Sequence, residues 1–308
     1  MRASSIRHLS ITDTSSIVAA ALYEKTVQIW LWKTGQQLGE FQTMLDFGGR
    51  RLALTPDGRT CIVGAWGQRG RGPRGLAAYS IPDGKLLWNR EDIHHIQYVT
   101  LSGSGREIYC GVEGSFAHII DAATGEQLGR VRSAIKIVGS RYTSHKLNVK
   151  KGGYLVNGES EFEILPLSFA LLDAVFSPEA LCLSEPKNAL HPREEVGGIR
   201  LIDLATAEQL WYLDLGSNHL AFNSSDRSFY CVDVARTAPH NRSLIRLASS
   251  LLECEQVVAL GRCWQEAFSP SGSVLVTNQG DVYQTSTGAL LSQLDFPKRD
   301  YPDASLRE

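Results

Sequence analysis

Residues Thr26 to Leu38 read TVQIWLWKTGQQL: an alternating run that contains Val27 and Ile29, the turn Thr34-Gly35, and then Leu38. Alternation of apolar and polar residues is typical of a half-buried β-strand. A glycine-containing turn between two such runs is typical of a β-hairpin. The segment therefore predicts a strand, a tight turn and a second strand.

The same turn, with a leucine three residues after its second position, occurs five times along the chain. The copies are Thr34-Gly35…Leu38, Asp83-Gly84…Leu87, Thr124-Gly125…Leu128, Thr206-Ala207…Leu210 and Thr287-Gly288…Leu291. Successive copies are separated by 49, 41, 82 and 81 residues, so each of the last two intervals spans two repeats. We therefore expect degenerate copies near residues 160 and 250, with Asn157-Gly158 and Ser249-Ser250 as candidates. This gives seven repeats.

A second element runs in step with the first: an apolar residue, a turn rich in Pro, Gly, Ser or Asp, and another apolar run. It occurs at residues 11–16, 54–58, 101–105, 176–178, 222–226 and 268–272. The two elements together predict four short strands per repeat, here called a, b, c and d in chain order. The expected units are residues 5–43, 47–93, 95–132, 133–168, 169–216, 217–260 and 261–297 of one domain, followed by a tail at 298–308.

Several of these segments resemble known propeller repeats. Ala21–Trp30 with Thr34-Gly35 resembles a blade of the WD-repeat family, as does the turn Phe268–Gly272, and Ala78–Trp88 and Leu201–Trp211 resemble quinoprotein-like repeats. The Gly-His and Trp-Asp pairs of well-formed WD repeats are absent, so the resemblance implies the fold and no named subfamily. That fold is an all-β, seven-bladed β-propeller of four-stranded antiparallel blades. Radial packing of the blades buries sheet faces that one blade alone would expose.

The order of the expected strands also predicts how the ring closes. A complete a-b-c-d series fits between residues 6 and 296, so blade one should meet blade seven without exchanging a strand. We expect Trp30, Trp66, Trp88, Trp211 and Trp264 to pack between blades. Blade four is expected to be irregular, because its turns depart from the repeat. Residues 147–149 could be its strand b or, in a shifted register, its strand a.

Composition limits the functions that the chain can have. The 308 residues are 43% hydrophobic and carry a formal charge of -2, which argues against binding to nucleic acid through bulk charge. No apolar run is long enough for a membrane span, so we expect a cytoplasmic protein with no membrane contact. The six cysteines are thinly spread, which favours buried reduced thiols. No catalytic or phosphate-binding motif is present, and we expect no metal and no cofactor. The oligomeric state stays open, with a monomer favoured.

The b–c connections of blades two, five and six are the strongest functional signal. They are long and rich in cationic side chains and histidines, whereas those of blades one and three are short. Such connections share one face of a propeller with the d–a connections, and insertions collect where a face is used. Arginine suits pairing with carboxylates at interfaces, so we expect an acidic protein partner, although solvated, tolerated insertions are an alternative. The expected partner-binding residues are Arg69, Arg71, Arg74, His191, Arg193, Arg236, His240 and Arg242. A protein of this kind could be an adaptor or a toxin-neutralising immunity protein.

A second candidate site lies at the mouth of the central channel, which strand a should line. One position of this strand, three residues before the apolar residue that precedes the a–b turn, is polar in six repeats. The residues there are His8, Arg51, Tyr98, Asp173, His219 and Gln265. A polar ring is normal for a water-filled channel, but His8, Arg51, Asp173 and His219 could also form the site of a lyase or hydrolase acting on a small polar substrate. An enzyme is therefore the alternative to a binding module.

Overall fold

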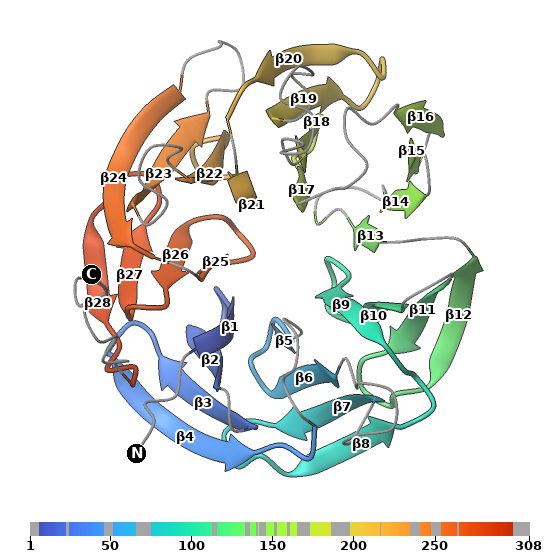
Figure 1. The fold of residues 1–308 in the computed structure, drawn as a ribbon, viewed down its shortest axis with the longest axis vertical. Coiled ribbons are helices and arrows are strands. Elements are labelled where there is room, and N and C mark those ends of the chain that lie inside the picture. Colours follow the sequence, from blue (N-terminus) through green and yellow to red (C-terminus); the bar gives the residue numbers. More distant parts are fainter. Residues whose placement is uncertain are drawn as a thin grey trace, which may run out of the picture.

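The chain folds into seven four-stranded antiparallel sheets arranged in a ring, a seven-bladed β-propeller, as the sequence predicts (Figure 1). The computed structural model describes residues 6–22, 25–45, 52–65, 75–112, 116–132, 136–139, 141, 146–150, 153–158, 161–164, 173–185, 198–215, 217–234, 241–247, 254–263 and 265–297. Among these residues, no helix is long and apolar enough to cross a membrane.

The seven blades follow one another in chain order. Blade one consists of β1 (Ile6–Ile11), β2 (Ile17–Leu22), β3 (Thr26–Leu31) and β4 (Gln36–Gln42). Blade two consists of β5 (Leu52–Leu54), β6 (Thr60–Ala65), β7 (Gly75–Ser80) and β8 (Leu86–Arg90). Blade three consists of β9 (Ile96–Leu101), β10 (Glu107–Val112), β11 (Phe116–Asp121) and β12 (Gln127–Arg132). Blade four consists of β13 (Lys136–Gly139), β14 (Lys146–Lys150), β15 (Gly153–Asn157) and β16 (Phe162–Ile164). Blade five consists of β17 (Asp173–Phe176), β18 (Ala180–Glu185), β19 (Gly198–Asp203) and β20 (Gln209–Leu213). Blade six consists of β21 (Ser217–Asn223), β22 (Ser228–Val234), β23 (Asn241–Leu247) and β24 (Cys254–Arg262). Blade seven consists of β25 (Glu266–Phe268), β26 (Val274–Thr277), β27 (Asp281–Gln284) and β28 (Leu290–Gln293).

The ring closes without a strand exchanged between its ends, because each sheet is built from four consecutive strands. Strand β1 lies beside β25, so blade one packs directly on blade seven. The Asp13 carboxylate fastens this junction: it accepts hydrogen bonds from the Ser271 backbone N–H at 2.6 Å and from the Ser271 hydroxyl at 2.7 Å. The predicted closure is therefore confirmed.

Blade four keeps the order of the other blades. Residues 147–149 lie in β14, which pairs with β13 on one side and β15 on the other. They therefore occupy strand b, and the shifted register that would place them in strand a is wrong. The outer strand β16 has only 3 residues, so this sheet has a short edge.

The recurring turn has a conformational requirement that explains its glycine. Gly35, Gly84, Gly125 and Gly288 have φ angles between 66° and 73°, the left-handed region that glycine enters without a Cβ clash. Ala207 takes the same place in blade five with φ at 61°, and its N–H donates to Asp203 O as that of Gly125 donates to Asp121 O. The copy at Thr206-Ala207, which has no glycine, therefore has the same turn conformation as the others.

The turns that contain glycine also approach the neighbouring blade. A Cβ built on Gly84 would lie 2.2 Å from Phe41 Cβ in β4 of blade one, and one on Gly125 would lie 2.7 Å from Trp88 Cδ2 in β8 of blade two. On Gly288 it would lie 2.9 Å from the Val257 carbonyl in β24 of blade six. The motif thus encodes contact between blades as well as a turn.

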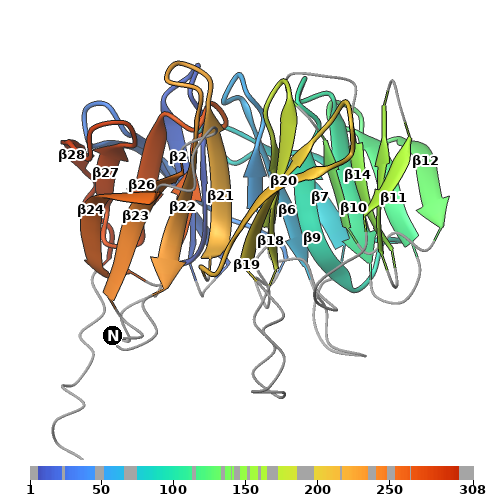
Figure 2. The same ribbon diagram turned by 90° about the horizontal axis from the view of Figure 1, so that it is seen from above.

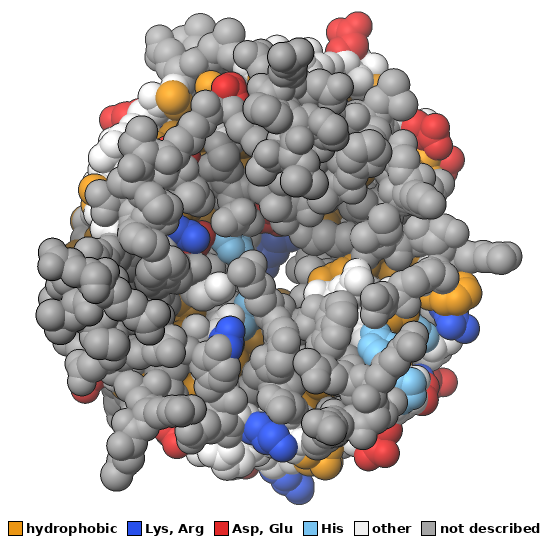
Figure 3. Space-filling model, in the orientation of Figure 1, with side chains coloured by type: hydrophobic (Ala, Val, Ile, Leu, Met, Phe, Trp, Pro, Cys, Tyr) orange, Lys and Arg blue, Asp and Glu red, His pale blue; other side chains and the backbone are white. Residues whose placement is uncertain are grey.

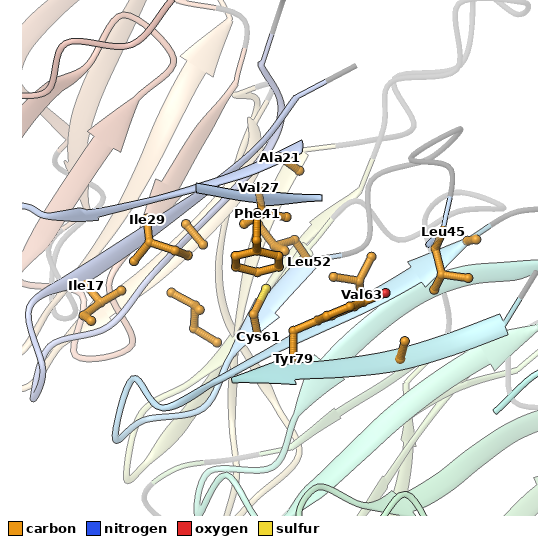
Figure 4. Close-up of a cluster of buried hydrophobic side chains, with 14 residues drawn as sticks. Ile17, Ala21, Val27, Ile29, Phe41, Leu45, Leu52, Cys61, Val63 and Tyr79 are labelled. Atoms are coloured by element: carbon orange, nitrogen blue, oxygen red, sulfur yellow. The ribbon is translucent and has the colours of Figure 1, made fainter. Parts of the chain in front are cut away.

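The hydrophobic core is divided among the seams between blades, with one cluster of buried side chains for each seam. In the cluster between blades one and two, Ile29 and Phe41 face Val63 and Tyr79 (Figure 4). The rings of Phe41 and Tyr79 have centroids 5.5 Å apart. Both faces of a blade are therefore covered by its neighbours, which is the physical reason for ring formation.

The tryptophans that the structure describes pack as predicted. Trp30 lies in the cluster shared with blade seven, and its ring meets Phe296 edge-on at 5.7 Å. The Trp88 indole N–H donates to Ala122 O of blade three at 3.2 Å, and Trp211 packs between blades five and six. Trp66 and Trp264 lie outside the described residues.

All six cysteines are free thiols. Five are buried, and Cys254 at the start of β24 is exposed. The expectation of reduced thiols is confirmed, with Cys254 as an exception to burial.

Candidate functional site

Antiparallel order gives the propeller two different faces. Strand a of every blade lies innermost (Figure 1), and all b–c and d–a connections share one face while all a–b and c–d turns share the other. We call these the b–c face and the turn face. The b–c connections at residues 66–74, 186–197 and 235–240 are long, whereas those at 113–115, 151–152 and 278–280 are short. The strand ends of the three long connections lie on one side of the ring when it is seen edge-on (Figure 2).

Most residues of the expected partner-binding group lie within these connections, outside the described residues. They are Arg69, Arg71, Arg74, His191, Arg193, Arg236 and His240.

Arg242 is the member of this group that the structure describes, and it has a different environment from the expected one. It lies in β23, its side chain is only 11% exposed, and its guanidinium pairs with the buried carboxylate of Glu266 in blade seven. Nη1 donates to Glu266 Oε1 at 2.6 Å and also contacts Oε2. Arg242 therefore connects blades six and seven, and its expected contact with a partner stays a prediction.

The expected channel-mouth residues do lie on innermost strands. His8 is in β1, Tyr98 in β9, Asp173 in β17 and His219 in β21, and Gln265 directly precedes β25. Arg51 lies outside the described residues. Sequence equivalence therefore placed these residues on the correct strand.

Two of these residues form hydrogen bonds between innermost strands of neighbouring blades. The Tyr98 hydroxyl accepts a hydrogen bond from the Ile137 N–H of blade four at 2.8 Å. The Asp173 carboxylate accepts one from the Leu220 N–H of blade six at 2.8 Å. Tyr98 and Asp173 thus connect two separate pairs of blades.

A charged cluster at the mouth between blades six and seven was missed by the sequence analysis. Its centre is Glu266, whose side chain is 0% exposed. Besides Arg242, the carboxylate has the His219 Nε2 at 3.8 Å and the Cys263 Sγ at 3.6 Å. Glu266 follows Gln265 directly, so the repeat pointed to the neighbouring position, and nothing in the sequence marked the buried carboxylate itself.

A second buried charged cluster lies at the seam between blades four and five. The Glu185 carboxylate accepts a hydrogen bond from the Tyr154 hydroxyl at 2.6 Å and lies 2.9 Å from Arg200 Nη2. The Arg200 and Glu185 side chains are 5% and 0% exposed. Burial and the neighbouring carboxylate raise the pKa of Tyr154, so its phenol stays protonated and can donate to Glu185.

The protonation state of the thiol in the Glu266 cluster follows from its surroundings. Burial and the negative charge of Glu266 raise the pKa of Cys263 to about 12, so this thiol is not a thiolate nucleophile near neutral pH. The described residues contain no group of three or more His, Cys, Asp or Glu side chains placed to hold a metal ion. Figure 3 shows histidine and Lys or Arg side chains at the rim of the central opening. Polar side chains at such a mouth can contact a ligand or the surface of a partner.

Comparison with known proteins bears on the fold. No family model matches the chain, and no curated protein matches it. Among solved structures it is similar to hydrazine synthase of Kuenenia stuttgartiensis, with 15% sequence identity and a TM-score of 0.67 over 93% of this chain and 97% of that chain. At this identity the likeness shows the β-propeller fold alone.

Proposed function

We propose that this protein is a non-catalytic interaction module that binds an acidic protein partner through its b–c face. One observation carries the proposal: the three long b–c connections join strand ends on one face of the ring. They contain Arg69, Arg71, Arg74, Arg193 and Arg236, and arginine pairs well with carboxylates at interfaces. The WD-repeat-like character inferred from the turns is part of this proposal.

The environment of the described charged groups supports binding over catalysis. Arg242 and Arg200 are each neutralised by a buried glutamate, and the Asp173 carboxylate accepts a backbone hydrogen bond from the next blade. Groups held in this way maintain the shape of a surface. An adaptor and an inhibitor or immunity protein that covers a toxin's active site are two roles for such a surface.

The proposal is tested by capturing partners from native extract with two triple variants. Arg69, Arg71 and Arg74 are replaced together by Glu in the first. Arg59, Lys85 and Arg106, which are exposed on the turn face, are replaced by Glu in the second. Both variants change the net charge equally, so bulk charge is controlled.

We expect one stoichiometric partner to be retained by the turn-face variant and lost from the b–c variant, with both melting at the wild-type temperature. Retention by both variants would contradict the role of the connection at 66–74. Equal loss from both would show that binding depends only on net charge.

An enzyme remains the second candidate, because His219 at the channel mouth lies 3.8 Å from the buried Glu266 carboxylate. A carboxylate beside an imidazole is an arrangement that can orient a general base. If no partner is captured, a screen of small polar metabolites for turnover should detect activity in the wild type. A His219→Ala variant should lose that activity while keeping its melting temperature.

A further inference from the structure

Two ion pairs stand apart from the others in the described part of the chain because both partners are buried. They are Glu185–Arg200, at 0% and 5% exposure, and Glu266–Arg242, at 0% and 11%. By contrast, the pair Arg227–Glu179 on the turn face is 72% and 59% exposed. Among the described residues, buried ion pairs thus occur in blade five and between blades six and seven.

Both buried pairs lie at the b–c face, next to the ends of long connections. Glu185 is the last residue of β18, directly before residues 186–197, and Arg200 is close to the start of β19. Arg242 is the second residue of β23, just after residues 235–240. Each pair also reaches a neighbouring blade: Tyr154 of blade four donates to Glu185, and Glu266 belongs to blade seven.

Stability alone does not account for this placement. Removing two charges from water costs about as much as their attraction returns, and apolar side chains of similar volume often serve stability equally well. The seams already contain apolar clusters, for example the one between blades six and seven that includes Tyr230 and Leu244. What a buried ion pair adds to such a seam is a fixed direction and distance between two strand ends.

We propose that Glu185–Arg200, with Tyr154, acts as a positioning pair for the b–c ends of blades four and five, that Glu266–Arg242 does the same for blades six and seven, and that these ends form the centre of the protein-binding surface. The inference rests on the proposed function and deepens it by locating the surface that receives carboxylates of the partner. A surface ordered before binding loses less conformational freedom on association. The charged pairs therefore act on binding through geometry, and their own charges cancel.

The test replaces the Glu266–Arg242 pair by methionines, which remove both charges and keep similar volumes. The variant R242M/E266M is compared with R227M/E179M, a charge-neutral double replacement of an exposed pair that also joins two blades. Hydrogen exchange of the free protein follows the amides of β23 and β25, with β10 as an internal reference. Binding is measured with a synthetic peptide of ten glutamates at 0.15 M salt.

For R242M/E266M we expect exchange at the start of β23 and in β25 to rise about tenfold, and peptide affinity to fall about fivefold, with β10 unchanged. R227M/E179M should match the wild type in both measurements. Unchanged exchange in R242M/E266M would overturn the positioning role, and faster exchange with unchanged peptide affinity would overturn the placement of the binding surface. If the wild type does not bind the peptide, the acidic partner of the proposed function and the placement of its surface both fail, while exchange still decides the positioning role.

Tyr154→Phe supplies a second variant that keeps every charge and changes only one hydroxyl. It removes the 2.6 Å hydrogen bond between blades four and five and leaves Glu185–Arg200 in place. We expect faster exchange at the end of β18 and about threefold weaker peptide binding. Wild-type values for both would contradict the proposal even if the methionine variants fail to fold.

Discussion

Replacing Gly84 by alanine should destabilise the ring through two separable effects. The first is conformational: Gly84 has φ at 66°, a left-handed value that costs an L-residue about 1–2 kcal/mol. The second is steric, because the new Cβ would lie 2.2 Å from Phe41 Cβ and 2.3 Å from Phe41 Cγ of the preceding blade. Phe41 is buried against Tyr79, so its ring has no free direction in which to move.

Overpacking of this kind typically costs about 1–3 kcal/mol, so the free energy of unfolding should fall by about 2–5 kcal/mol in total. Gly261 offers a matched control, since its φ is 63° and a Cβ there would meet nothing within 4 Å. Gly261→Ala should therefore lose only the conformational part, about 1–2 kcal/mol. Any excess loss in Gly84→Ala measures the contact between blades.

The assay is equilibrium unfolding in urea with a shared slope for all variants. In a Phe41→Ala background, the excess cost of Gly84→Ala over Gly261→Ala should shrink, because the ring atoms at 2.3 and 2.8 Å are gone, but it should not vanish, because alanine keeps the Cβ at 2.2 Å. Equal losses for the two glycine variants in the wild-type background would refute the conclusion that the turn glycine is needed for packing between blades.

Three further predictions concern the ring junction, the thiols and alkaline pH. Asp13→Asn should lower the free energy of unfolding by about 1–2 kcal/mol in the same urea assay, because an amide N–H would face one of the two Ser271 donors. Asp83→Asn, at an exposed turn, should leave the free energy of unfolding nearly unchanged. Ellman's reagent at pH 8 should react quickly with one thiol in the native protein and with six after denaturation. Cys254→Ser should abolish the fast phase. More than one fast thiol would contradict the buried positions of the other five cysteines. Burial raises the pKa values of Tyr98, Tyr109, Cys61 and Cys182 above their ordinary values of 10.0 and 9.0, so above about pH 9 the unfolded chain loses protons that the folded chain keeps. The calorimetric melting temperature should therefore fall as the pH rises from 9 to 11, and a constant value would count against these burial effects.

Local sequence chemistry determined the number of blades and their order. Gly84 and Gly125 mark turns that need a positive φ, and alternating runs such as Val27–Ile29 mark strands, although only the structure shows that β3 is buried on both faces. Both signals depend only on residues close in the chain, so they repeat with the period of the fold. Ala207 has the same backbone conformation as these glycines, so the spacing of the repeat predicts the turn even where the residue is not glycine. Repetition also placed His8, Tyr98, Asp173 and His219 on the innermost strands.

The tertiary structure alone decided which of those polar side chains meet. Arg242 and Glu266 are far apart in the repeat pattern, one in strand c and one in strand a, yet the seam between blades six and seven brings them into contact. Likewise Tyr154 and Glu185 belong to different repeats and meet only because blade four packs on blade five. Contacts across a seam depend on how two sheets are set against each other, and no local period records that arrangement. For this reason the sequence could predict a ring of strands but could not predict that Arg242 pairs with the buried carboxylate of Glu266.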